Sequence, residues 1–150
     1  MKHRTLARAE PLSGPSEWVM AAARCWRAAR DCGAPVQQRL HALLSGRNRD
    51  MLAPVFDSLM TFYEAALGRK IATGREAPSP DECLLLGLLN EAKPWLARTG
   101  CAEGLAAALD CAIRSARIMI ALSERENLMP ARGQGPQSIA KAPPLAQCAA

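Results

Sequence analysis

The apolar residues of this chain recur every three or four positions, the spacing that places them on one side of an α-helix. The repeat is clearest in five residues of one segment, which are Leu52, Phe56, Leu59, Tyr63 and Ala66. Val, Ile and Thr are few and do not alternate with polar residues, and aromatic residues make up only 4% of the chain. The sequence therefore predicts an all-α fold, a compact bundle of four to five helices.

Glycines, prolines and capping residues divide the chain into helical segments. We expect these segments at about 16–33, 35–46, 50–67, 80–94 and 102–128. Residues 16–128 are therefore expected to form a single helical domain. It is expected to lie between a flexible N-terminal arm, residues 1–15, and a disordered, proline-rich tail, residues 129–150.

Two local patterns fix where helices begin. In the segment SPDE, Ser79 and Glu82 match a capping box, and Pro80 suits the first helical position. Pro54 is tolerated only in a first turn, so the third helix either begins close to Ala53 or kinks there. The helix after SPDE is rich in leucine on all sides, which predicts a central and largely buried helix.

The first helix is expected to have a buried side and a basic side. At 100° per residue, the buried side holds Trp18, Ala22, Cys25, Ala29 and Cys32. Three arginines and Asp31 lie on the opposite side, and two more arginines follow in the next link. These five arginines form a possible phosphate-contacting patch, made of Arg24, Arg27, Arg30, Arg47 and Arg49. A nucleic-acid-associated protein is therefore one alternative function.

Charge and motif patterns limit that alternative. Residues 1–49 carry a net charge of +6 and residues 50–128 a net charge of −3, so positive charge is concentrated in the arm and the first two helices. A helix-turn-helix is excluded, because the third helix would present Met51, Leu52, Val55 and Phe56 where base edges require polar side chains. Only binding to the nucleic-acid backbone remains compatible with the sequence.

The six cysteines are not spaced for a metal site or a disulfide framework; they are Cys25, Cys32, Cys83, Cys101, Cys111 and Cys148. Cys25 and Cys32 lie about 10.5 Å apart along a helix, too far for a disulfide between them. The chain has no CxxC motif, so we expect packing roles, no metal and no cofactor. A reducing cytoplasm, most simply bacterial, fits this cysteine usage. No apolar run is long enough to cross a membrane.

Catalytic groups are scarce. The only histidines are His3, in the arm, and His41, which lies beside the apolar stripe of its helix. No phosphate-binding glycine loop or di-iron motif occurs, so the sequence predicts no catalytic residue and favours a protein that is not an enzyme. A small-ligand binder or enzyme with a site in the bundle core is a second alternative.

The best function on sequence grounds is a small, non-catalytic cytoplasmic interaction or regulatory protein. Its partner would be another protein chain, either a different protein or a second copy in a homodimer. The candidate interface is the exposed part of the leucine-rich segment, represented by Leu84, Leu85, Leu88, Trp95 and Leu96.

Overall fold

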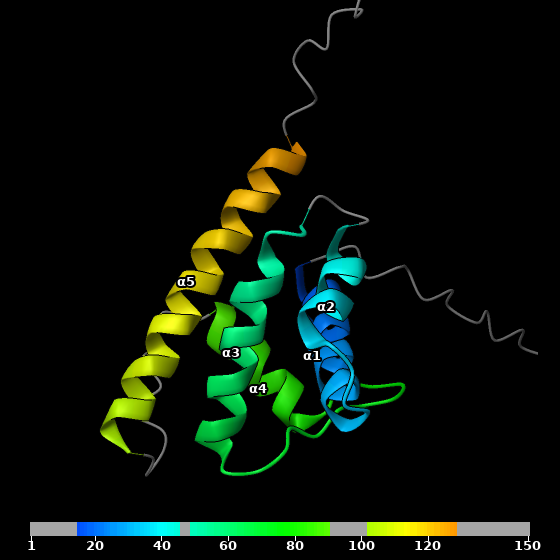
Figure 1. Cartoon of the computed structure of the whole chain (residues 1–150). Helices are drawn as coiled ribbons and strands as arrows, with labels where there is room; N and C mark the ends of the chain where they lie inside the picture. The colour runs from blue at the N-terminus through cyan, green and yellow to red at the C-terminus, as the bar shows by residue number, and fades with distance from the viewer. Residues whose placement is uncertain (1–14, 46–48, 91–101, 129–150) are drawn as a thin grey trace, which may run out of the picture.

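The computed structural model describes residues 15–45, 49–90 and 102–128 of the chain, and these residues form helices and loops without a strand. The helices are α1 (Pro15–Asp31), α2 (Val36–Ser45), α3 (Leu52–Leu67), α4 (Pro80–Asn90) and α5 (Glu103–Leu128). They pack into the bundle shown in Figure 1. The all-α prediction is confirmed. Residues 1–14 of the predicted arm, the predicted tail and the Pro94 boundary fall outside the described residues, and Pro15 is the first residue of α1.

Most helix ends follow the local patterns. Gly33 and Gly68 lie just beyond α1 and α3 with φ of 64°, a left-handed conformation that glycine adopts without strain. Pro54 sits in the first turn of α3, so this helix starts next to the proline and needs no kink to accommodate it. The capping box is confirmed: Ser79 Oγ accepts a hydrogen bond from the Glu82 N–H at 3.1 Å, and Glu82 Oε2 accepts one from the Ser79 N–H at 2.7 Å.

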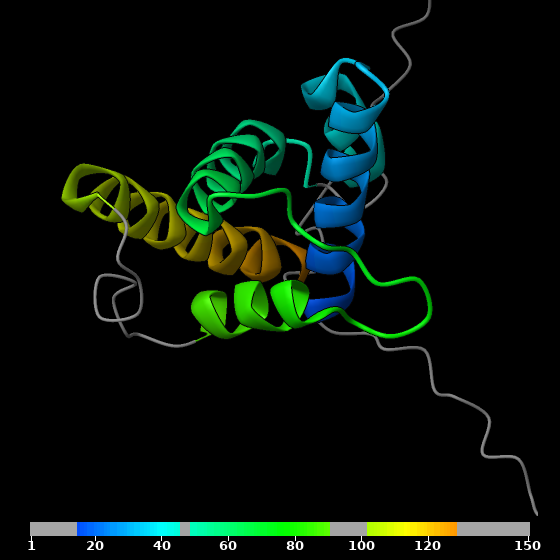
Figure 2. The same ribbon diagram turned by 90° about the horizontal axis from the view of Figure 1, so that it is seen from below.

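The core is centred on α3, which packs against α1, α2 and α5. Figure 2 shows α3 beside α5, with α1 and α4 approaching from other sides. The largest fully buried side chains include Trp26, Phe56, Leu59, Met60 and Tyr63, four of them from α3. The prediction that the leucine-rich helix would be central is wrong. That helix, α4, packs mainly against α1 and α5 and meets α3 through the Tyr63–Asp81 hydrogen bond, and its leucines at 84 and 86 stay half-buried.

The buried side of α1 is confirmed at Trp18, Ala22 and Ala29 but is rotated at its edge. Cys32 is exposed and Cys25 half-buried, whereas Arg27 is only 5% exposed. Val19, Ala23 and Trp26 complete the core contacts of this rotated side. The rotation is possible because Arg27 finds a carboxylate partner on α3, which compensates the burial of its charge.

Helix α5 is the longest helix and runs antiparallel to α3 (Figure 1). Its last turns project beyond the start of α3, so this end has fewer neighbours than the rest of the helix. No helix in the described ranges is both long enough and apolar enough to cross a bilayer.

Candidate functional site

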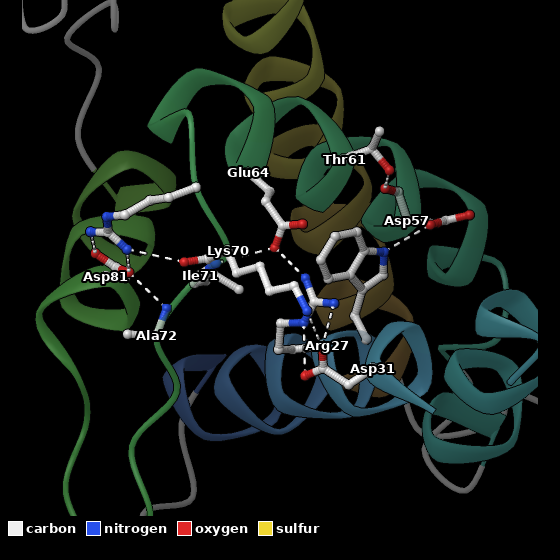
Figure 3. A network of polar contacts seen from close by, with 11 residues as sticks. Arg27, Asp31, Asp57, Thr61, Glu64, Lys70, Ile71, Ala72 and Asp81 are labelled. Carbon is white, nitrogen blue, oxygen red and sulfur yellow. Dashed lines mark hydrogen bonds and ion pairs between the residues drawn. The ribbon is translucent and has the colours of Figure 1, made fainter. Parts of the chain in front are cut away.

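Two of the five candidate arginines are bound inside the molecule. Arg24 donates from Nε and Nη2 to the fully buried carboxylate of Glu82, at 2.6 and 3.1 Å. Arg27 donates to Glu64 at 2.5 Å and to Asp31 at 2.9 and 3.2 Å (Figure 3). Both guanidinium groups therefore face carboxylates of the same chain, and a phosphate would have to compete with those carboxylates.

These ion pairs anchor the loop between α3 and α4. Each of three carboxylates is paired with an arginine and also accepts a backbone N–H of the loop. Glu64 accepts from Ile71 at 3.1 Å, and Asp81 accepts from Ala72 at 2.8 Å (Figure 3). Glu82 accepts from Gly74 at 3.0 Å. The loop is thus fixed by charge-assisted hydrogen bonds, which are about twice as strong as neutral ones.

The same contacts shift the pKa values of Asp81, Glu82 and the neighbouring Tyr63. The guanidinium of Arg69 holds the pKa of Asp81 below its ordinary value. Burial disfavours ionisation of Glu82, but hydrogen bonds from Arg24 and from backbone N–H groups outweigh it and lower the pKa of that carboxyl. Burial raises the pKa of Tyr63, whose hydroxyl donates to the Asp81 carbonyl at 2.8 Å. Asp81 and Glu82 are therefore ionised at neutral pH and hydrogen-bonded within the chain, which suits a structural role.

Of the other three candidate arginines, two lie over tryptophan rings and one is outside the described residues. Arg30 is exposed, and its guanidinium carbon lies 5.0 Å from the centre of the Trp26 ring. Arg49 lies at the same distance from the Trp18 ring. Arg47 is outside the described residues. The structure therefore leaves Arg30 as the one described member of this set that is largely exposed.

A small pocket of about 130 Å³ lies between α1, α2 and Arg49, which precedes α3. Its lining includes Glu17, Leu43, Trp18 and Arg49. The indole N–H of Trp18 and two guanidinium nitrogens of Arg49 are buried and have no acceptor among the described residues. Because these nitrogens are closed to solvent, the polar groups left to an approaching ligand are the Glu17 carboxylate and the remaining part of the guanidinium of the half-buried Arg49.

The cysteines and His41 are dispersed. Cys32, Cys83 and Cys111 are exposed, and burial raises the pKa of the half-buried Cys25. His41 is exposed and lies 3.8 Å from Asp50. Within the part of the chain that the structure describes, no three His, Cys, Asp or Glu side chains come together in a way that could hold a metal ion.

The candidate interface residues of the leucine-rich segment are not gathered on one surface. Leu85 and Leu88 are buried in the chain's own core, and Leu84 is half-buried. Trp95 and Leu96 lie outside the described residues. An exposed apolar surface is found elsewhere, on α3 and α5.

This surface begins with a groove of about 500 Å³ between α3 and α5. The groove has no charged residue in its lining, which consists of Pro54, Val55, Ser58, Phe62, Ala108, Cys111, Ala112 and Ser115. Just beyond it on α5, Ile118 and Leu122 are 61% and 48% exposed. We call the groove together with these two side chains the α3–α5 face.

A sequence signal for this face exists in α5. The positions Ala108, Cys111, Ser115, Ile118 and Leu122 are spaced by three, four, three and four residues. This is a heptad seam, distinct from the buried side of α5. The seam escaped the sequence analysis because its first three residues are small and give little apolar contrast.

Comparisons with known proteins returned nothing: no family model, no curated protein and no solved structure matches this chain. The function is therefore argued from the chain's own surfaces. Among the described residues, the α3–α5 face combines a hollow of about 500 Å³ with two large exposed apolar side chains.

Proposed function

We propose that this protein is a small, non-catalytic helical interaction module that binds another protein chain through the α3–α5 face. The observation that carries the proposal is an uncharged groove of about 500 Å³ continued by Ile118 and Leu122. Single exposed apolar residues are common on protein surfaces, but an apolar groove adjoining two of them is typical of a docking site.

The chemistry of the face favours a protein partner over a small ligand. From the middle of the groove to Leu122 the face extends about 16 Å along α5, at 1.5 Å per residue. A partner that covers this length must present a row of apolar side chains, which an amphipathic helix does at its three- and four-residue spacings. Binding would bury Ile118 and Leu122, and each fully buried side chain of this kind contributes about 1.5–3 kcal/mol.

Nucleic-acid binding is the weaker proposal, since Arg24 and Arg27 already pair with carboxylates. A cytoplasmic setting forms part of our proposal and is supported by the exposed thiols of Cys32, Cys83 and Cys111, while a bacterial origin stays a prediction from the sequence. In an oxidising compartment such thiols would be open to disulfide exchange.

The proposal is tested by placing a photo-crosslinking amino acid at position 118 and expressing the full chain in its native cells. The same amino acid in place of Gln38, which is exposed on α2, serves as the control. Irradiation is expected to join the position-118 variant to a protein chain, and the position-38 variant to none. No crosslink at position 118, or equal crosslinking at both positions, would contradict the proposal.

A further inference from the structure

We infer that the partner seated on the α3–α5 face is a second copy of this chain, docked with the two α5 helices antiparallel. In this arrangement Ile118 and Leu122 of each copy fill the groove of the other. The inference rests on the proposed function, because it assigns the occupant of the same face.

The face is complementary to itself. Its hollow half lies around Cys111 and Ala112, and its protruding half around Ile118 and Leu122. The two halves are centred about 13 Å apart along α5. A two-fold axis crossing α5 near Ala116 and Arg117 places each protruding half over the opposite hollow half. Such an isologous contact, in which the same patch is used twice, is the usual geometry of a homodimer.

A parallel arrangement does not achieve this. It would set Ile118 and Leu122 of one copy against the same residues of the other and would leave the two grooves facing each other unfilled. Protein interfaces pack about as densely as interiors, so unfilled hollows lose contacts. The heptad seam agrees with the antiparallel arrangement, because it pairs Leu122 with Cys111 and Ile118 with Ser115 across the interface.

The area available for a second copy is small. From Ala108 to Leu122 the face is about 21 Å long, and two adjacent helices are about 20 Å wide. Both copies together would bury roughly 800 Å², which is below the standard size of a specific interface and typical of a weak, transient one. We therefore expect a reversible dimer with a dissociation constant in roughly the micromolar range.

The absence of charge on the α3–α5 face is compatible with a second copy as its partner. The chain has a net charge of +5, which opposes self-association in general. The groove lining and the two protruding side chains are uncharged, so the contacts that they make with a second copy bury no charge of their own. The dimer is consequently expected to persist in high salt, unlike a complex held by phosphate contacts.

The first test is the mass of the purified full chain by sedimentation equilibrium across a wide concentration range. The mass is expected to rise from 16.1 kDa toward twice that value. The double substitution Ile118→Glu and Leu122→Glu is expected to keep the chain monomeric, whereas Ala121→Glu, an exposed position on the same helix outside the α3–α5 face, leaves dimerisation intact. Circular dichroism of all three chains checks that they fold.

The second test fixes the direction of the helices. Under mild oxidation, the thiol introduced by Leu122→Cys is expected to link to Cys111 of another copy, as identified by peptide mapping. Adding Cys111→Ser is expected to abolish that link. A link between two copies of position 122 would indicate a parallel pair and overturn the inference.

The results separate the two proposals. A wild-type chain that stays at 16.1 kDa at every concentration, or a dimer that survives Ile118→Glu with Leu122→Glu, overturns the self-association inference. If position 118 then crosslinks to a different protein in cells, the proposed function stands with another partner. If position 118 crosslinks to nothing, both fail.

Discussion

The two tryptophans of α1 differ in the hydrogen bonding of their indole N–H groups. Both rings are buried, and each has an arginine guanidinium carbon 5.0 Å from its centre. Trp26 donates to Asp57 at 2.8 Å, while the Trp18 N–H has no acceptor among the described residues. A hydrogen bond to a charged acceptor stabilises a fold, whereas an unpaired buried donor costs free energy.

We therefore predict that Trp26→Phe lowers the free energy of unfolding more than Trp18→Phe does, by about 1–2 kcal/mol. Both substitutions remove the same atoms from the same helix, so each is the control for the other. Urea unfolding followed by circular dichroism measures both values. Equal losses would show that the Trp26–Asp57 hydrogen bond contributes nothing to stability.

At residue scale, sequence patterns predict only contacts between near neighbours. The capping box of Ser79 and Glu82 was predictable, since its partners are three positions apart. The Arg24–Glu82 and Arg27–Glu64 pairs join residues 58 and 37 positions apart. Such pairs depend on how the helices pack, which local spacing does not encode. For this reason the basic side of α1 looked like open surface.

Among the elements, the loop between α3 and α4 depends most on electrostatics. Its residues contribute little to the core apart from Ile71, and its order comes from the carboxylates of Glu64, Asp81 and Glu82. Glu82 makes the most of these contacts, because its carboxylate caps α4, accepts the Gly74 N–H and binds Arg24 on α1.

Glu82→Gln is predicted to lower the free energy of unfolding by about 2 kcal/mol at pH 7, because it leaves Arg24 without its anionic partner. The pKa of Glu82 is lowered by folding, so its ionisation stabilises the wild type above the ordinary value of 4.5. That contribution is lost as the pH falls through the lowered pKa.

The difference in stability between wild type and Glu82→Gln should therefore shrink as the pH falls from 5 toward 2. Urea titrations at several pH values measure it. Glu76→Gln, at an exposed position on the same loop, is the control and should change stability by less than about 0.5 kcal/mol. A difference that stays constant with pH would contradict the electrostatic role of Glu82.

For the molecule as a whole, the sequence predicts which helices exist and in what order, because apolar spacing and capping residues act locally. The sequence does not predict which helix is central. Leucine content pointed to α4, yet α3 has the neighbours on several sides that make it central. The α3–α5 face also required the structure, since half of the groove comes from α3 residues such as Val55 and Phe62.

At the scale of the whole molecule, the account depends on one claim: the α3–α5 face is covered by a partner, and the partner is a second copy. Cys111 lies in the groove, while Cys32, just after the end of α1, and Cys83, on α4, are exposed elsewhere. Docking of a second copy would cover the thiol of Cys111 and leave the thiols of Cys32 and Cys83 exposed.

The most direct measurement is the rate of alkylation of each thiol in the wild-type chain as protein concentration rises, read by peptide mass spectrometry. We predict that Cys111 reacts more slowly as the concentration passes through the micromolar range, whereas the rates at Cys32 and Cys83 stay constant. A Cys111 rate that is independent of concentration would contradict the account.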